Sequence, residues 1–277
     1  MIMSKIKKFF LNQNMSWLKV IIFAIITSVM TAVLNLIPIL ENTSFRDIAI
    51  NFDCWFLFAV FIIVNCEKWW EASLKTFVFF LISQPLIYLI EVPFSPLGFG
   101  LFGYYKYWFI VTLLTLPGAA IAFQVKQKNL LSAIVLSAAI AYLGYISAYY
   151  FWNIIADFPY HLLSLIFCIA LAIFFIYCLL DKRNHRIICA AVLIVSLSVS
   201  LFVLKPETKW TIELPENVQS FTIEDKSVAE STLNDDGTVT LTAKNKGGTT
   251  IKIICPSGII EYYVTVTNGG IFVNEIT

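Results

Sequence analysis

The chain has 277 residues, of which 59% are hydrophobic and 13% are charged, and its formal net charge is +1. Soluble globular proteins contain about 45–50% apolar and about 25% charged residues. These values exclude a water-soluble enzyme, a disordered regulator and a basic nucleic-acid-binding protein, because the charges are too few to cover a soluble surface or to hold a polyanion. A membrane protein remains, with the lipid bilayer as its first partner.

The charged residues divide the chain into two regions. Residues 1–204 contain 13 Lys/Arg and 8 Asp/Glu, whereas the much shorter stretch 205–277 contains 6 and 10. The second density is near that of a soluble protein. We therefore expect a membrane domain that ends near Leu204, followed by a water-exposed domain over residues 205–277.

The membrane domain contains seven apolar stretches, each near the roughly 17–25 residues that a membrane-spanning helix requires. They follow an N-terminal segment of residues 1–16, and their approximate limits are 17–40, 49–66, 74–94, 107–125, 130–152, 160–180 and 187–204. The second has a short apolar run because Asp53 lies within it. The sequence predicts a membrane all-α fold over 17–204, a seven-helix transmembrane bundle, since helices satisfy their own backbone hydrogen bonds in lipid.

The basic residues predict the orientation of these spans. If the N-terminus is cytoplasmic, eleven basic side chains fall on the cytoplasmic side: Lys5, Lys7, Lys8, Lys19, Lys68, Lys75, Lys126, Lys128, Lys182, Arg183 and Arg186. Only Arg46 and Lys106 fall on the other side. Because Lys and Arg are retained in cytoplasmic loops, we expect a cytoplasmic N-terminus and an extracytoplasmic C-terminal domain. All seven tryptophans lie near predicted span ends, as expected for an interfacial girdle.

Two prolines lie near the predicted middle of the bilayer. Gln84 precedes Pro85 in the third span, and Pro117 precedes Gly118 in the fourth. Each proline removes a backbone donor and frees a carbonyl one turn earlier. The simpler interpretation is that both prolines only bend their helices. The alternative is a substrate site of broken helices, with Gln84 as a polar contact.

Few ionisable residues lie within the predicted spans. Asp53, Glu91 and Asp157 are near the outer ends. Glu91 is either a solvated carboxylate at the interface, which is the simpler interpretation, or part of a vestibule with Asp53. Asn35, near the end of the first span, is expected to make a hydrogen bond between helices.

The sequence contains no pattern typical of intramembrane catalysis. There is no His-Glu-x-x-His or Gly-x-Ser-x-Gly motif, and the two histidines are His161 and His185. Asp157 and His161 form either an acid–base or weak metal pair or, more simply, a helix cap and an interfacial histidine. The sequence predicts no catalytic residue, metal site or cofactor.

The fifth span carries small residues on one face. They are Ala133, Ser137, Ala141, Gly144 and Ala148. Small faces allow close approach of membrane helices. We expect this span either to pack in the centre of the bundle or to form a contact between two copies of the chain.

The C-terminal region alternates in short runs that are typical of strands. The expected strands are 210–214, 218–224, 228–232, 238–243, 249–254 and 259–267. The segments 235–237 and 246–248 are typical hairpin turns. This spacing predicts a small all-β sandwich.

A family resemblance covers about residues 207–267. Ser227-Val228-Ala229, Asp236-Gly237-Thr238-Val239, Leu241-Thr242-Ala243, Gly247-Gly248-Thr249-Thr250-Ile251 and Val264-Thr265-Val266 occur in this order. The segment resembles the bacterial immunoglobulin-like group 2 domain. That resemblance implies an immunoglobulin-like sandwich, a bacterial plasma-membrane protein of the cell envelope, and a module that binds an envelope glycan or protein or acts as a spacer. It implies no catalytic residue.

Three functions are compatible with these observations. The first is a non-enzymatic envelope scaffold or binding protein. The second is a small-molecule or lipid transporter, or its substrate-binding subunit, that uses the third and fourth spans. The third and weakest is an enzyme at the outer interface, acting through Glu91, Asp157 or His161. A cavity that reaches Gln84 and Pro117 would favour transport, whereas a dry, packed interior would favour the scaffold.

Overall fold

A computed structural model describes residues 2–41, 43–156, 158–214, 220–234, 237–256, 258–267 and 270–276. The chain divides into two compact units. The helical unit comprises Met1–Phe151 and Pro159–Ser200, and the β unit comprises Trp152–Phe158 and Leu201–Thr277. Mostly apolar helices are therefore followed by antiparallel sheets, as the composition predicts.

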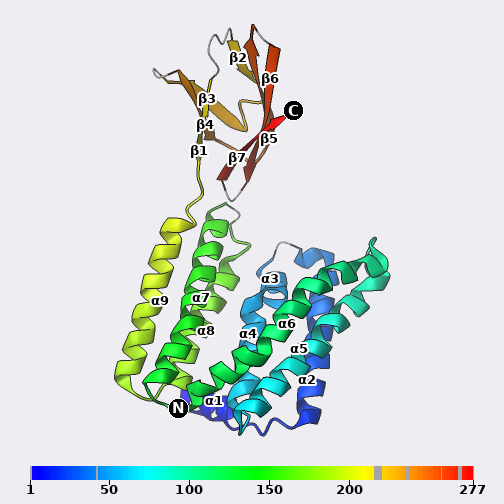
Figure 1. Ribbon diagram of the computed structural model, residues 1–277, viewed down its shortest axis with the longest axis vertical. Coiled ribbons are helices and arrows are strands. Elements are labelled where there is room, and N and C mark those ends of the chain that lie inside the picture. Colours follow the sequence, from blue (N-terminus) through cyan, green and yellow to red (C-terminus); the bar gives the residue numbers. More distant parts are fainter. Residues whose placement is uncertain are drawn as a thin grey trace. The chain divides into compact units, whose positions relative to one another are not determined.

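The described residues form nine α-helices (Figure 1). They are α1 (Ile2–Leu11), α2 (Trp17–Leu36), α3 (Ser44–Ile50), α4 (Phe52–Val64), α5 (Trp69–Glu91), α6 (Phe102–Ala122), α7 (Leu130–Ala156), α8 (Leu162–Leu179) and α9 (Arg183–Val203). Short 3-10 helices lie between some of these α-helices, at Pro38–Leu40, Val92–Phe94, Gly98–Leu101 and Phe123–Gln127. Six of the α-helices, namely α2 and α5 to α9, are long and apolar enough to cross a membrane.

The predicted span 49–66 differs from the structure. This region is a pair of helices, α3 and α4, bent by 48° at Asn51, and the pair qualifies as a seventh span only if it counts as one. Asn51 has extended backbone angles at the start of α4, and Asp53 lies in the first turn of that helix. Polar residues at a helix start favour a new N-terminus over a continuous helix.

Other helix limits also extend beyond the predicted ones. Helix α5 begins at Trp69 rather than 74, and α6 begins at Phe102 rather than 107. The additional turns contain charged or aromatic residues, which a search for uninterrupted apolar residues omits. Residues 1–16 were predicted only as a cytoplasmic segment, but Ile2–Leu11 forms the helix α1.

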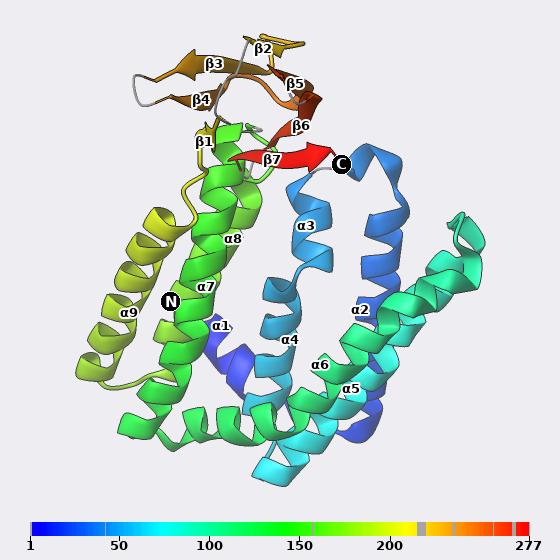
Figure 2. The ribbon, with the colours of Figure 1, turned by 45° about the horizontal axis from the view of Figure 1, so that its top comes forward.

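Helix α4 belongs to two apolar cores. Its Val60 and Val64 pack in one cluster with residues of α7, α8 and α9, whereas Ile62 and Ile63 pack in another with residues of α2, α5 and α6. Figure 2 shows α4 between these two groups of helices. A helix that is apolar on all sides is buried on all sides. Trp55 of α4 is 1% exposed in the second core, so the prediction of an interfacial position is wrong for this tryptophan.

Helix α1 attaches to the end of the bundle that carries most of the basic residues. Its Phe10 is buried and contacts the ring of Phe174 with centroids 4.9 Å apart. The Lys7 ammonium lies 2.9 Å from one oxygen of Asp181, and Lys128 lies 2.7 Å from the other. Apolar burial and a shared carboxylate therefore hold α1 in place.

The small face of α7 packs against α9 of the same chain. The Ser196 hydroxyl of α9 donates to the carbonyl of Ala141 at 2.6 Å. A Cβ atom added at Gly144 would lie 2.8 Å from Ser196 Oγ, so only glycine permits this approach. The structure shows this face packed within the helical unit, and the contact between two copies of the chain stays a prediction.

The β unit contains two antiparallel sheets that share one apolar core. The strands in the described residues are β1 (Lys209–Glu213), β2 (Ser220–Ile223), β3 (Ala229–Leu233), β4 (Thr238–Ala243), β5 (Gly247–Cys255), β6 (Gly258–Thr267) and β7 (Gly270–Ile276). One sheet has the order β1-β4-β3 and the other the order β2-β5-β6-β7. Val239 and Leu241 of β4 face the core, as their alternation predicts.

Six of these strands match the expected runs within a few residues, and β7 was not predicted. Strands β3 and β4 pair antiparallel, whereas residues 235 and 236 of the predicted turn lie outside the described residues. The predicted hairpin at 246–248 is wrong, because β4 and β5 belong to different sheets. Gly247 and Gly248 therefore begin β5, after the chain has crossed from one sheet to the other.

Strand β7 approaches the chain segment before β1. The amide of Ile271 donates to the carbonyl of Glu207 at 2.9 Å. Gly270 has φ +116°, and a Cβ atom there would lie 2.5 Å from the Glu207 carbonyl oxygen. Both the backbone angle and the space require glycine.

We predict that Gly270→Ala weakens the β unit by about 3 kcal/mol, because the methyl group meets backbone that cannot rotate away. Hydrogen–deuterium exchange of the full chain in detergent would show lost protection in β1 and β7. Gly237→Ala is the matched control, since Gly237 has φ +81° with open space around it. It should cost only about 1 kcal/mol for the backbone angle. Equal protection in the two variants would contradict the close approach.

The attachment of α1 should depend on pH. Hydrogen bonds from Lys128 and Lys7 lower the pKa of Asp181 from 3.8 to about 2. A lowered pKa in the folded state means that the stabilisation is present above about pH 4 and is lost as pH falls through about 2. We expect the protection of the α1 amides, measured as their exchange rate relative to that of an unfolded peptide at the same pH, to be lost over that interval in the native chain. The variant Asp181→Asn should show the faster exchange at neutral pH, without the acid transition.

Candidate functional site

The break between α3 and α4 leaves backbone groups that side chains must satisfy. The carbonyl of Ala49 accepts hydrogen bonds from Trp55 Nε1 at 3.1 Å and from Thr31 Oγ1 at 3.3 Å. The amide of Asn51 donates to the carbonyl of Asp47 at 2.8 Å. In an apolar environment an unsatisfied carbonyl costs several kcal/mol, so α2 and α4 together stabilise the break.

One side of α3 faces a chain of polar groups from α2 and α5. Arg46 Nε donates to Asn35 Oδ1 at 2.8 Å, and Asn35 Nδ2 donates to Glu91 Oε1 at 2.7 Å. This confirms the predicted helix–helix hydrogen bond of Asn35. Glu91 is 7% exposed, so the interpretation of a solvated interfacial carboxylate is wrong. The carboxylate is buried because the Asn35 amide connects it to the Arg46 guanidinium.

The other side of α3 faces α8. Asp47 Oδ2 lies 2.6 Å from Nδ1 of His161 and accepts a hydrogen bond from Ser164 Oγ at 3.3 Å. The sequence paired His161 with Asp157, which lies outside the described residues. The described partner of His161 is therefore Asp47. Helix α8 begins at Leu162, with His161 as its N-cap residue rather than Asp157.

A second carboxylate, Asp53, lies deeper in the unit and is 1% exposed. Its Oδ2 accepts hydrogen bonds from Cys168 Sγ at 3.2 Å and from the Tyr150 hydroxyl at 3.5 Å. Asn51 Nδ2 donates to the same hydroxyl at 2.7 Å. Asp53 therefore belongs to the α7 and α8 side of the break, apart from Glu91, and the two do not form one vestibule.

A cavity of about 90 Å³ adjoins the break on the Glu91 side. Its lining residues are Thr31, Asn35, Ile50, Trp55, Gln84, Ile87, Tyr88, Glu91 and Trp108. Gln84 is 4% exposed, and its amide makes no hydrogen bond to any residue that the structure describes. The cavity thus joins two predicted site residues, Gln84 and Glu91, with an amide that lacks a partner.

The remaining predicted site residues lie elsewhere. Helices α5 and α6 continue through Pro85 and Pro117. Pro85 is half-buried, and Pro117 and Gly118 are exposed. None of the three lines the 90 Å³ cavity.

Several residues of the site were not identified from the sequence. They are Arg46, Asp47, Asn51, Tyr150 and Cys168. Arg46 and Asp47 lie between the predicted spans 17–40 and 49–66, whereas the structure places them in α3. The interruption Asn51-Phe52-Asp53 within an apolar stretch was the available signal, because polar residues there are expensive unless they have partners.

The arrangement favours binding over catalysis. Ser164 donates to Asp47 rather than to the His161 ring, whereas a serine nucleophile needs the histidine between itself and the carboxylate. Within the described ranges, no three His, Cys, Asp or Glu residues are close enough to hold a metal ion. What the site offers is a carboxylate, an amide and three aromatic residues around a small space.

The two donors to the Ala49 carbonyl predict a non-additive pair of variants. Trp55→Phe and Thr31→Val should each cost about 1 kcal/mol of unfolding free energy, because one donor remains. The double variant should cost about 1–3 kcal/mol more than their sum, since the buried carbonyl then lacks both. Thermal unfolding of the purified chain would measure this. Combined with Trp55→Phe, the control Thr27→Val should be additive, because Thr27 bonds only within α2.

Comparisons with known proteins identify no relative of this chain. No protein-family model matches the chain, and neither a curated protein nor a solved structure is similar to it.

Proposed function

We propose that the chain is a multi-pass protein of a bacterial plasma membrane, with a cytoplasmic N-terminus and seven spans. The six long apolar helices and the bent pair α3–α4 support this number. Contacts among the basic residues support the orientation: Lys7 and Lys128 share Asp181, Lys126 donates to the Cys66 carbonyl, and Lys75 donates to the Met15 carbonyl. These lysines therefore gather at one end of the helical unit, as cytoplasmic residues should. An odd number of spans leaves the β unit extracytoplasmic.

We further propose that the β unit is an immunoglobulin-like domain. In that fold, strands B, E and D lie in one sheet and C, F and G in the other. The order β1-β4-β3 has the former pattern and β2-β5-β6 the latter, if β1 is strand B. Strand β7 is then an addition beside strand G. Together with the family resemblance, this order supports a module that binds an envelope glycan or protein.

For the helical unit, the geometry best supports binding and transport of a small organic cation. The observation that carries this proposal is the partnerless Gln84 amide, which shares a cavity with the Glu91 carboxylate. A scaffold gains nothing from an unfilled polar cavity, since packed interiors contain few voids larger than a water molecule. The cavity reaches Gln84 and not Pro117, and it supports the transporter, or its binding subunit, through the first of these residues.

The charges around the break favour a cation. Among the described residues that line the cavity, Glu91 is the one with an acidic or basic side chain, and it is a carboxylate. The aromatic residues Trp55, Tyr88 and Trp108 complete the lining of the cavity. A carboxylate with aromatic residues is typical of sites that bind substituted ammonium ions.

The volume limits the size of the ligand. The cavity of about 90 Å³ is far smaller than the roughly 300–1,000 Å³ of drug-sized ligand sites, so it suits a small ion. Dimethylammonium has three heavy atoms and tetramethylammonium has five. We therefore expect the smaller ion to bind and the larger one to be excluded.

Calorimetric titration of the purified chain with dimethylammonium chloride tests the site. The variant Glu91→Gln should bind about tenfold or more weakly, because a charged hydrogen-bonding group is lost. The control Glu67→Gln changes an exposed glutamate outside the cavity lining and should bind as the native chain does. Equal binding by Glu91→Gln, or equal binding of tetramethylammonium, would contradict the proposal. Transport is tested separately by uptake of radiolabelled dimethylammonium into proteoliposomes, which should exceed that of protein-free liposomes.

A further inference from the structure

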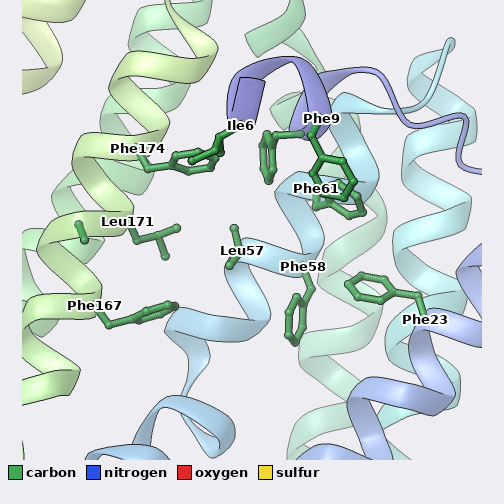
Figure 3. A pocket seen from close by; sticks show the side chains of 11 residues that line it. Ile6, Phe9, Phe23, Leu57, Phe58, Phe61, Phe167, Leu171 and Phe174 are labelled. Atoms are coloured by element: carbon green, nitrogen blue, oxygen red, sulfur yellow. The ribbon is translucent and has the colours of Figure 1, made fainter. Parts of the chain in front are cut away.

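A second, larger pocket lies beside α1, outside the candidate solute site. Its volume is about 460 Å³, within the roughly 300–1,000 Å³ typical of ligand sites. The lining residues are Ile6, Phe9, Phe10, Phe23, Leu57, Phe58, Phe61, Phe167, Ala170, Leu171 and Phe174. Figure 3 shows side chains of α1, α2, α4 and α8 around this space. Every one of these side chains is a hydrocarbon, so the pocket suits an alkyl chain.

The pocket is held open by the way α1 is anchored. Phe10 is buried among Phe61, Phe174 and Phe175. Ile6, one turn before Phe10 on the same face of α1, remains 41% exposed, and the neighbouring Phe9 remains 66% exposed. Two large apolar side chains of α1 therefore line the pocket without filling it.

A polar pocket of about 240 Å³ adjoins the neighbouring face of α1, which carries Lys7 and Leu11. It is lined by Lys7, Leu11, Asn12, Val64, Val125, Lys126, Lys128, Cys178, Leu179 and Asp181. The three lysines exceed the single carboxylate by two positive charges. Such a pocket suits an anion.

The two pockets follow one another along the same helices. On α8, Phe167 to Phe174 line the apolar pocket, and the polar pocket continues from Cys178. On α4, Leu57 to Phe61 are followed by Val64. Each step is about one helical turn, or about 5.4 Å. Alkyl and anionic sites are thus arranged in the order of a lipid tail and its headgroup.

We propose that these two pockets bind one anionic phospholipid of the surrounding bilayer. An acyl chain occupies the apolar pocket beside α1, and the phosphate lies with Lys126 and Lys128. Charge complementarity selects this occupant, because a neutral lipid or a detergent would leave the excess positive charge uncompensated. The site shares no lining residue with the Glu91 cavity, so its test does not require that the transport proposal be correct. The lysines belong to the set that the sequence places on the cytoplasmic side, where anionic lipids are abundant.

The acyl-chain part is tested by filling the pocket. Ala170 is exposed and lines it, so Ala170→Trp places an indole in the space without replacing a core residue. The matched control is Ala191→Trp, an exposed alanine of α9 that does not line the pocket. Native mass spectrometry would measure retention of added palmitoyl-oleoyl phosphatidylglycerol by each purified chain. We expect Ala170→Trp to lose the bound lipid and Ala191→Trp to keep it.

The headgroup part is tested with charge variants and a neutral lipid. The native chain should retain phosphatidylglycerol more tightly than palmitoyl-oleoyl phosphatidylcholine. Lys126→Gln with Lys128→Gln should weaken phosphatidylglycerol retention by at least about tenfold, given about fivefold per lysine. Lys126→Arg with Lys128→Arg should restore it. Lys5→Gln with Lys8→Gln is the control, since these lysines lie near the same end of α1 but line neither pocket.

Three results would overturn the proposal. Equal retention of the two lipids by the native chain would show that the lysines select no anion. Unchanged retention by Ala170→Trp would show that the lipid binds elsewhere on the apolar surface. Equal weakening by the Lys5 and Lys8 control would likewise indicate general attraction to the basic end rather than a site.

Discussion

The architecture of the helical unit depends on the hydrogen bonds that satisfy the free backbone groups at the break between α3 and α4. The Ala49 carbonyl has no helical partner where α3 ends. It accepts hydrogen bonds from the Trp55 indole of α4 and the Thr31 hydroxyl of α2. Neither donor would be positioned there if α2 and α4 were not packed in one core. The break therefore requires its neighbours, and its neighbours approach because α4 is apolar on every side. A short polar interruption in the sequence therefore determines how the neighbouring helices pack.

The break also distributes the charged groups. Because Arg46 and Asp47 are consecutive in a helix, they point toward different neighbours. Arg46 reaches Asn35 and through it Glu91, whereas Asp47 reaches His161 and Ser164. One short helix therefore joins two separate polar clusters. The cluster on the Glu91 side adjoins the 90 Å³ cavity that Gln84 also lines, which is why that side carries the proposed binding function.

Much of the fold could be predicted from composition and pattern, but the pairing of polar residues could not. Apolar runs located the long helices, and alternation located six of the seven described strands. The sequence predicted a span with a short apolar run where the structure breaks at Asn51, because mean hydropathy over a window carries no information about backbone angles. Likewise, Glu91 was assigned to water since its partner Asn35 is distant in sequence. The crossing after β4 was mistaken for a hairpin because the same glycines suit both connections.

Helix α4 links the two proposed sites. Its first turn carries Asp53 and Trp55, at the break, and its later turns carry Leu57, Phe58 and Phe61, at the apolar pocket. Any change in the 48° bend at Asn51 must move one end of α4 relative to the cores on both sides. A rigid α4 would carry that movement toward α1, which rests on Phe61 through Phe10. Solute binding at the break and lipid binding beside α1 are therefore expected to influence each other through this one helix, with reciprocal effects on affinity.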